Sequence, residues 1–186
     1  AGHSVSGHGF SGIARGGFLM KVSGTTSDGK KNIEIHVRGG KIAAIRTSSP
    51  ERGKGPKRPC ITPGFFDIQV NGFAGVDINS PELHADQLLD VCRALLATGT
   101  TRFCPTLITA DPDLLKRNIR QIASACERHP LVSRMAAGVH LEGPYISPED
   151  GPRGAHERQW VRNPDWNEFE ELQRLSSGRI VIVTIA

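Results

Sequence analysis

From residue 61 onward the sequence repeats one pattern, in which a short apolar run precedes an amphipathic segment. The apolar runs are ITPGFFDIQVNG (61–72), TTRFCPTLI (100–108), MAAGVHLE (135–142) and RIVIVTIA (179–186). Their starts lie about 35–45 residues apart, which is typical of strands joined by helical crossovers. Such alternation predicts a parallel sheet of four strands, because a crossover helix returns the chain to the same end of the sheet.

Three dipeptides predict where the helices between these strands begin. Ser80-Pro81, Asp111-Pro112 and Asn163-Pro164 each pair a capping side chain with a proline, which fits the first turn of a helix. Apolar residues then recur at helical spacing, and Gly99 ends the first helix. The predicted apolar faces are Leu88, Val91, Cys92, Leu95 and Leu96; Leu114, Leu115, Ile119 and Ile122; and Phe169, Leu172 and Leu175.

A sheet of this kind can be an open doubly wound sheet or a (β/α)8 barrel. No G-x-G-x-x-G follows the first strand, which counts against the dinucleotide-binding form of the open sheet. A whole barrel takes about 250 residues, and residues 63–186 provide about half of that. We therefore predict an α/β fold that is the first half of a TIM-like (β/α)8 barrel, truncated after its fourth strand.

Residues 17–62 have a different rhythm, with alternating runs at 18–24, 33–39 and 41–45 separated by glycine turns. This pattern predicts a small antiparallel unit, taken to be part of a β-sandwich. His36 alternates with apolar neighbours and is expected at an exposed strand position. Residues 1–16 are rich in glycine and serine without periodicity, and they are interpreted as a flexible leader or cloning remnant.

Composition excludes several classes of function. With 38% apolar and 23% charged residues the chain is expected to be globular, and no apolar run reaches the ~20 residues that cross a bilayer. The net charge is +4, and the basic run at 52–59 lacks aromatic residues for base stacking, so no nucleic-acid partner is expected. The cysteines form no C-x-x-C pair, and Cys60, Cys92, Cys104 and Cys126 are expected to be buried free thiols in a reducing compartment.

Polar residues gather at the carboxyl ends of the predicted strands, where the active sites of barrels lie. They are Gln69, Asn71, Thr106, His140 and Glu142. Glu142 is followed at once by Gly143-Pro144, so the turn is expected to hold its carboxylate in one place. The next segment, 144–164, is a loop of about 20 residues, and loops of that length are usually functional. Spacing alone makes His156 in this loop an ordinary loop histidine.

Several stretches resemble the N-acetylglucosamine-6-phosphate deacetylase family of the amidohydrolase superfamily. They are PGFFDIQVNGFAGVDIN, GTTRFCPTLIT and GVHLEGPYIS with PRGAH soon after, and the resemblance runs from about residue 35 to the last residue. It implies that Glu142 ligates one divalent metal, with zinc first and iron, cobalt or manganese as alternatives. Ala155 and His156 would contact the sugar.

The resemblance also assigns the remaining strand-end residues. Gln69 and Asn71 occupy the positions of the two histidines of the amidohydrolase HxH motif, as in a mononuclear branch of the family. Because amides are poor metal ligands, they are expected to line the site, and His140 either orients Glu142 or packs. The general base, an aspartate, and two further histidine ligands are expected beyond residue 186.

The expected function of the full-length protein is metal-dependent hydrolysis of the acetamide of N-acetylglucosamine 6-phosphate, giving glucosamine 6-phosphate and acetate. The expected partner is this small amino-sugar phosphate, and the full-length enzyme is expected to be a cytoplasmic homodimer. Two alternatives stay open: another hydrolase or deaminase of the superfamily, and a non-catalytic, truncated protein that binds sugar phosphates.

Overall fold

The computed structural model describes residues 19–49 and 58–186, which fall into two compact units, one ending at Pro63 and the other beginning at Gly64. The predicted leader at 1–16 lies outside the described residues, and so does most of the basic run at 52–59.

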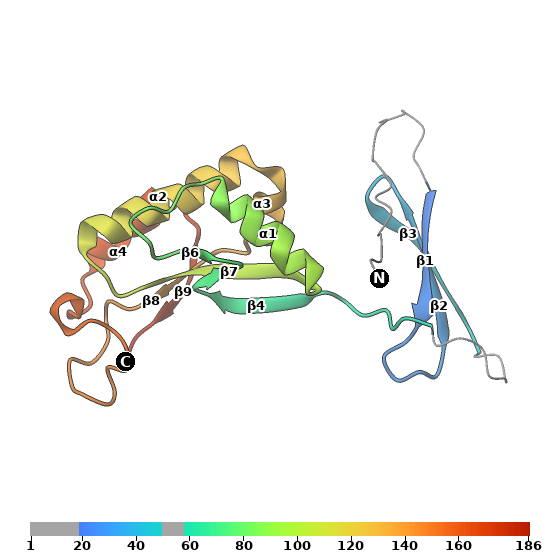
Figure 1. The fold of residues 1–186 in the computed structure, drawn as a ribbon, viewed down its shortest axis with the longest axis horizontal. Coiled ribbons are helices and arrows are strands. Elements are labelled where there is room, and N and C mark those ends of the chain that lie inside the picture. Colours follow the sequence, from blue (N-terminus) through green and yellow to red (C-terminus); the bar gives the residue numbers. More distant parts are fainter. Residues whose placement is uncertain (1–18, 50–57) are drawn as a thin grey trace, which may run out of the picture. The chain divides into compact units, whose positions relative to one another are not determined.

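The first unit is an antiparallel sheet of three strands in the order β1-β2-β3 (Figure 1). The strands are β1 (Leu19–Thr25), β2 (Asn32–Arg38) and β3 (Lys41–Ser48). Gly39 and Gly40 form the turn between β2 and β3 with φ values of +57° and +74°. A two-residue hairpin turn with both φ values positive matches the strand twist and favours glycine, so the glycine turn sets the pairing.

His36 is a correction to the expected exposed position. Its side chain is buried, with 9% of the residue exposed, and its Nε2 is hydrogen-bonded to Glu34. β2 is the central strand of this sheet, so strands on both sides help to cover its side chains. A register shift between His36 and Val37 also interrupts the alternation on which the prediction depended.

The second unit contains the predicted parallel sheet, in the order β4-β7-β8-β9. Its strands are β4 (Phe65–Val70), β7 (Thr100–Ile108), β8 (Val139–Glu142) and β9 (Ile180–Thr184), and a two-stranded ladder of β5 (Gly72–Phe73) and β6 (Val76–Asp77) follows β4. Ile108 on β7 pairs with Glu142 on β8, and Glu142 pairs with Thr184 on β9. The carboxyl ends of these three strands therefore meet at one edge of the sheet.

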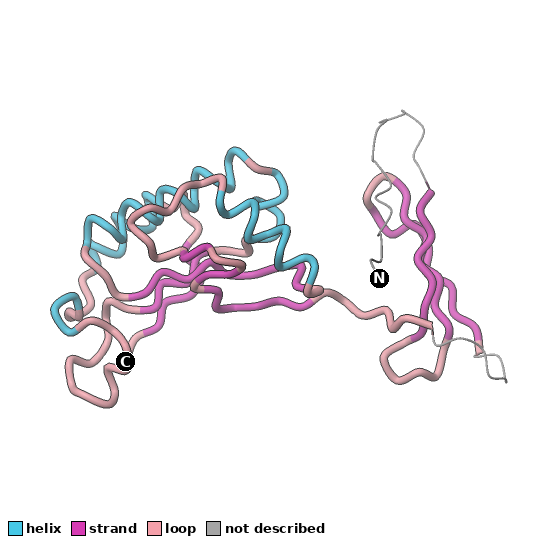
Figure 2. Tube along the Cα trace, viewed as in Figure 1, coloured by secondary structure: helices cyan, strands magenta, loops and turns pink. Residues whose placement is uncertain are grey.

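Four helices lie over one face of this sheet (Figures 1 and 2). They are α1 (Gln87–Ala97), α2 (Pro112–Arg128), α3 (Pro130–Met135) and α4 (Trp166–Leu175). Among the described residues, no helix has the length and apolar character needed to span a membrane. The core lies between the helices and the sheet, and it includes Leu88, Val91, Phe103, Leu107, Leu115, Ile119, Ile122, Leu141 and Leu172. Burial of each large apolar side chain contributes about 1.5–3 kcal/mol, so this layer fixes the sheet that carries the site.

One of the three predicted helix starts is confirmed. The carboxylate of Asp111 accepts hydrogen bonds from the backbone N–H groups of Asp113 and Leu114, at 2.9 and 3.2 Å, and α2 begins at Pro112. The predicted start at Ser80-Pro81 is wrong, because the Ser80 hydroxyl accepts from Glu82 within a turn and α1 begins only at Gln87.

The start predicted at Asn163-Pro164 is displaced by two residues. Asp165 caps α4 instead, accepting from the N–H groups of Asn167 and Glu168. The predicted third strand is also shorter than expected, since residues 130–135 form α3 and the strand begins at Val139. Proline at the start of α3 fits the same capping logic, but the six-residue helix is too short to show periodicity.

Three of the four cysteines are buried free thiols, as predicted: Cys92, Cys104 and Cys126. Burial, and next to it the neighbouring thiol of Cys126, raises the pKa of Cys92 to about 11. Cys60 is exposed, which corrects the prediction for that residue. It makes only an isolated bridge to Thr25, outside the strands, so no layer of the described chain covers its thiol.

Candidate active site

A bulge in β4 builds one side of the site. Ile68 and Gln69 together lie opposite the single residue Cys104 of β7, because the register shifts between Asp67 and Val70. A bulge bends the strand and redirects a side chain, and such features are common at barrel rims and beside active sites. Here Nε2 of Gln69 donates a hydrogen bond to Oε2 of Glu142 at 2.8 Å. The bond connects β4 to β8 across the intervening strand β7.

His140 makes a second connection across the same strands. Its Nδ1 lies 3.1 Å from the carbonyl oxygen of Ile68, which can only accept, so Nδ1 carries a proton. Its Nε2 lies 2.8 Å from the hydroxyl of Thr184 on β9. With 5% of the residue exposed, His140 is a buried cross-link between β4, β8 and β9. It lies two residues before Glu142, on the same face of β8.

Gly143 fixes the turn that follows Glu142. Its φ is +84°, and a Cβ atom there would come within 2.2 Å of the Thr109 hydroxyl oxygen and 3.0 Å of Ile146 Cγ1. No other amino acid fits this position without moving the neighbouring chain. The turn therefore holds the half-buried Glu142 at the end of β8, as the sequence predicted.

A cavity of about 420 Å³ lies at the carboxyl ends of β7, β8 and β9. Glu142 and Thr184 line it from the strand ends, and Arg153, Ala155 and His156 line it from the loop 144–164. The structure thus brings together the predicted metal ligand and the two predicted sugar contacts, which are more than ten residues apart in the sequence. Thr184 and Arg153 were not predicted, although Thr184 could have been found as the polar residue at the end of the fourth strand.

Gln69, Asn71 and Thr106 lie beside this cavity and are not among the residues that line it. Gln69 reaches the site through its bond to Glu142. Thr106 is buried, accepting from the N–H of Val70 at 3.1 Å and donating to the Cys104 carbonyl, so it joins two strands. The backbone carbonyl of Asn71 accepts from the N–H of Ile78, which ties Asn71 to the start of the next segment.

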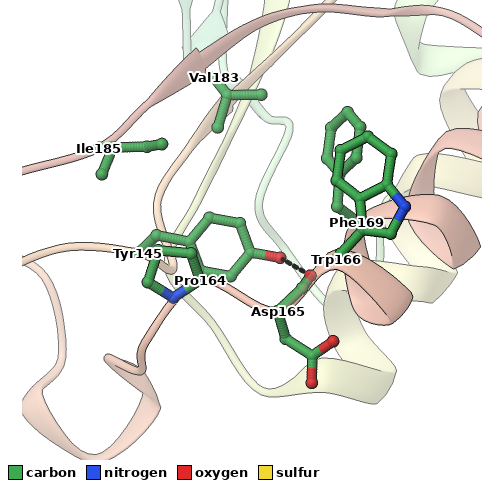
Figure 3. Close-up of a pocket in the computed structure, with 7 residues that line it drawn as sticks. All are labelled: Tyr145, Pro164, Asp165, Trp166, Phe169, Val183 and Ile185. Atoms are coloured by element: carbon green, nitrogen blue, oxygen red, sulfur yellow. Dashed lines mark hydrogen bonds between the residues drawn. The ribbon is translucent and has the colours of Figure 1, made fainter.

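A second cavity, of about 360 Å³, has a different character (Figure 3). Its lining is largely apolar, and the rings of Trp166 and Phe169 pack at 5.4 Å between centroids. The Tyr145 hydroxyl donates to the backbone carbonyl of Asp165 at 3.3 Å. Its residues are Tyr145, Pro164, Asp165, Trp166, Phe169, Val183 and Ile185. The one carboxylate of its lining, that of Asp165, caps α4, so this cavity offers no group for hydrolysis. The cavity at the carboxyl ends of β7, β8 and β9 is therefore the candidate active site.

Tyr145 provides a direct test of this packing. Burial, followed by the charge of Glu168, raises the pKa of Tyr145 to about 12, against an ordinary value near 10. As pH rises from about 10 to about 12 the unfolded chain loses its phenol proton first, so Tyr145 stabilises the fold below pH ~10 and this contribution is lost by pH ~12. Tyr145 is the only tyrosine of the chain, so the rise in ultraviolet absorbance when tyrosinate forms reports on this one residue. We expect the titration midpoint of the folded chain to lie well above that of the urea-unfolded chain. Coinciding midpoints would contradict the packing. The Tyr145→Phe variant provides the blank.

Among residues 19–49 and 58–186, no group of three or more His, Cys, Asp or Glu side chains is arranged to hold a metal ion. Glu142 by itself has the chemistry of a ligand at the site, because Gln69 engages its Oε2 and Glu142 lines the cavity at the strand ends. A carboxylate oriented by a hydrogen bond is a typical metal ligand, so the donor set fits one member of a larger site.

The comparisons with known proteins agree with one another, although no protein-family model matches the chain. The N-acetylglucosamine-6-phosphate deacetylase of Mus musculus is 33% identical over 190 residues, covering 94% of this chain and 41% of the mouse protein. The protein of the same name from Bacillus subtilis is 31% identical over 165 residues, covering 84% of this chain and 40% of its own length.

Solved structures give the same result. The crystal structure of N-acetylglucosamine-6-phosphate deacetylase from Pasteurella multocida has a TM-score of 0.69 at 25% identity, covering 90% of this chain and 45% of that one. The one from Thermotoga maritima has a TM-score of 0.66 at 27% identity, covering 82% and 39%. This chain spans about two fifths of the length of the curated relatives it matches. In sequence and in fold, the chain is similar to part of the N-acetylglucosamine-6-phosphate deacetylases.

Proposed function

We propose that this chain is the N-terminal part of an enzyme that hydrolyses the acetamide of N-acetylglucosamine 6-phosphate to glucosamine 6-phosphate and acetate. The observation that carries the proposal is the cavity in which Glu142 at a strand end faces Ala155 and His156 of a long loop. The names of the relatives support the same substrate.

Glu142 is proposed as one ligand of a single divalent metal ion, with zinc first and iron, cobalt or manganese as alternatives. When bound, such an ion would polarise the amide carbonyl and activate a water molecule. Gln69 orients the carboxylate through the bond to Oε2. A second metal ion at this position would need a stronger ligand than the neutral amide of Gln69, so only one ion is proposed. The other ligands and the general base would come from residues outside the described part of this chain.

Ala155 and His156 are proposed as sugar contacts. Nδ1 of His156 is buried and has no hydrogen-bond partner among the described residues, so a bound hydroxyl group could complete it. Ala155 is small, which lets a ligand approach the backbone. His140 is proposed as a positioning residue, because it ties together the strands that present Glu142 and Thr184.

The second unit is proposed as half of a (β/α)8 barrel. Its parallel strands have helices on one face, and a side-chain hydrogen bond joins β4 to β8 across β7. Both edge strands expose apolar side chains, such as Phe65 and Phe66 on β4 and Val181 on β9. Further strands of the full-length protein would cover these edges. The three strands of the first unit would be part of a β-sandwich, and we infer a cytoplasmic homodimer from the family resemblance.

The proposal is tested with the full-length, metal-loaded protein. Acetate release is measured with N-acetylglucosamine 6-phosphate and with unphosphorylated N-acetylglucosamine, and ring opening is measured in parallel with cyclic amides. We expect turnover of the sugar phosphate to exceed that of the other compounds. Preferred turnover of a cyclic amide would point to another hydrolase of the superfamily, and tight binding of the sugar phosphate without acetate release would point to a non-catalytic binder; either result would overturn the proposal.

A further inference from the structure

The tip of the loop 144–164 is a series of tight turns closed by one side chain, that of Arg153. Nη1 of Arg153 donates to the backbone carbonyl of His156 at 2.6 Å, and Nη2 donates to Oδ1 of Asp150 at 2.5 Å. The backbone N–H of Arg153 donates to the Glu149 carbonyl at 3.0 Å. The guanidinium thus spans the turn from its beginning to the residue that carries the imidazole.

The bond to His156 matters because it holds the backbone from which that imidazole extends. Nδ1 of His156 is buried without a partner among the described residues, so no hydrogen bond to that atom orients the ring. Arg153 bonds the carbonyl of that same residue, and the His156 N–H in turn donates to the Arg153 carbonyl at 3.3 Å. Two bonds between these two residues define the backbone from which the imidazole enters the cavity.

A separate cluster holds the base of the same loop. Nη2 of Arg162 lies 2.5 Å from Oε1 of Glu168 on α4, and the backbone N–H of Arg162 donates to the Pro144 carbonyl at 3.1 Å. The loop is therefore attached to the rest of the unit without help from Arg153. Losing Arg153 should loosen the tip while the base and the core keep their places.

We propose that Arg153 is a positioning residue for substrate binding, which fixes the loop tip so that Ala155 and His156 face the cavity. The inference rests on the proposed function, and it deepens that function by assigning a residue outside the GAH motif. Buried Nε of Arg153 also lacks a partner among the described residues, as His156 Nδ1 does, so two unpaired nitrogen atoms lie on residues that line the cavity.

The test uses three variants of the full-length protein. Arg153→Met keeps the stem and removes both side-chain bonds, whereas Arg153→Lys keeps the charge but has no rigid fork to span two acceptors. Arg158→Met is the matched control, because Arg158 is exposed on the same loop and lies outside the cavity lining. Surface substitutions away from packed groups have small effects, so the control should change kcat/KM by less than about threefold.

For Arg153→Met we expect kcat/KM with N-acetylglucosamine 6-phosphate to fall about 10- to 100-fold, since a displaced contact costs up to that much. The fall should be seen mainly in KM, with metal content and melting temperature close to wild type, and Arg153→Lys should recover part of it. Wild-type kinetics in Arg153→Met would overturn the inference. A loss of melting temperature in step with the loss of activity would also overturn it, because Arg153 would then be structural only.

Hydrogen exchange separates this inference from the proposed function. Backbone amides of 149–157 should exchange faster in Arg153→Met than in wild type or Arg158→Met, whatever reaction the protein catalyses. An inactive wild-type enzyme with this exchange pattern would contradict the proposed function and leave the loop assignment standing. An active wild-type enzyme with unchanged exchange in Arg153→Met would contradict the loop assignment alone.

Discussion

Replacing Glu142 with glutamine in the full-length protein is expected to remove most of the bound metal and most of the activity, while the fold persists. Glutamine has nearly the same shape and can still accept the hydrogen bond from Gln69, so the strand end should keep its structure. The amide is neutral and a weak metal ligand. Removing a group that only orients a metal ligand typically lowers metal affinity or activity about 10- to 100-fold. Removing the ligand itself should therefore lower them by more than about 100-fold. Metal analysis and steady-state kinetics of the purified variant provide the measurement.

The matched control is Glu149→Gln, which removes an exposed carboxylate from the loop near the same cavity. We expect this variant to keep its metal and its rate, because no cavity-lining role depends on that side chain. Full metal occupancy together with a wild-type rate in Glu142→Gln would rule out the metal-ligand assignment.

The second large effect is expected for His156→Ala, with a fall of up to about 100-fold in kcat/KM for the sugar phosphate. A hydrogen bond to an uncharged group contributes about 0.5–1.5 kcal/mol, which alone is a factor of about 2 to 13. If the imidazole also aligns the substrate with the reacting groups, misplacement adds to that loss. Metal content should stay at the wild-type level, which distinguishes this variant from Glu142→Gln. The kinetic constants and the metal content are measured on the same preparation.

Thermal unfolding provides the counter-test for His156. Loop substitutions away from packed groups usually change stability by less than about 0.5 kcal/mol, so the melting temperature should shift little. His84→Ala, at an exposed position outside both cavities, is the control for loss of a histidine as such. A large fall in melting temperature with unchanged kcat/KM would show that His156 pins the loop and does not contact the sugar.

The strands and the strand-end residues could be predicted because both follow from local patterns. Apolar runs identified all four strands of the parallel sheet, and the rule that polar groups at their carboxyl ends converge placed Glu142 beside His140 and Gln69. Helix starts were less predictable. The hydroxyl of a serine such as Ser80 can accept a hydrogen bond within a turn as well as at the start of a helix. Leu83 is buried although it lies outside any helix, so apolar packing here does not require one.

The structure of the loop tip and the burial of His36 could not be predicted, because both depend on contacts that no local pattern contains. The bond from Arg153 to the His156 carbonyl spans three residues of irregular backbone, for which no periodicity exists to be recognised. Burial of His36 depends on its place in a central strand and on a register shift, and alternation alone reports neither. In the loop the deciding contact joins a side chain to the backbone, and in β2 it joins neighbouring strands. The preference of a single residue for helix, strand or turn contains no information about such contacts.

The bulge at Ile68 and Gln69 determines which sequence changes β4 can tolerate. In a regular strand, inserting or deleting one residue moves every following side chain to the opposite face. In β4 the step out of register has already occurred between Asp67 and Val70, and Gln69 lies within it. The direction of Gln69 is therefore set by the local bend and by the carbonyl that Ile68 offers to His140. Substitutions of the exposed Phe65 and Phe66 are expected to leave Gln69 in place, whereas deletion of one bulged residue should break both cross-strand bonds at once.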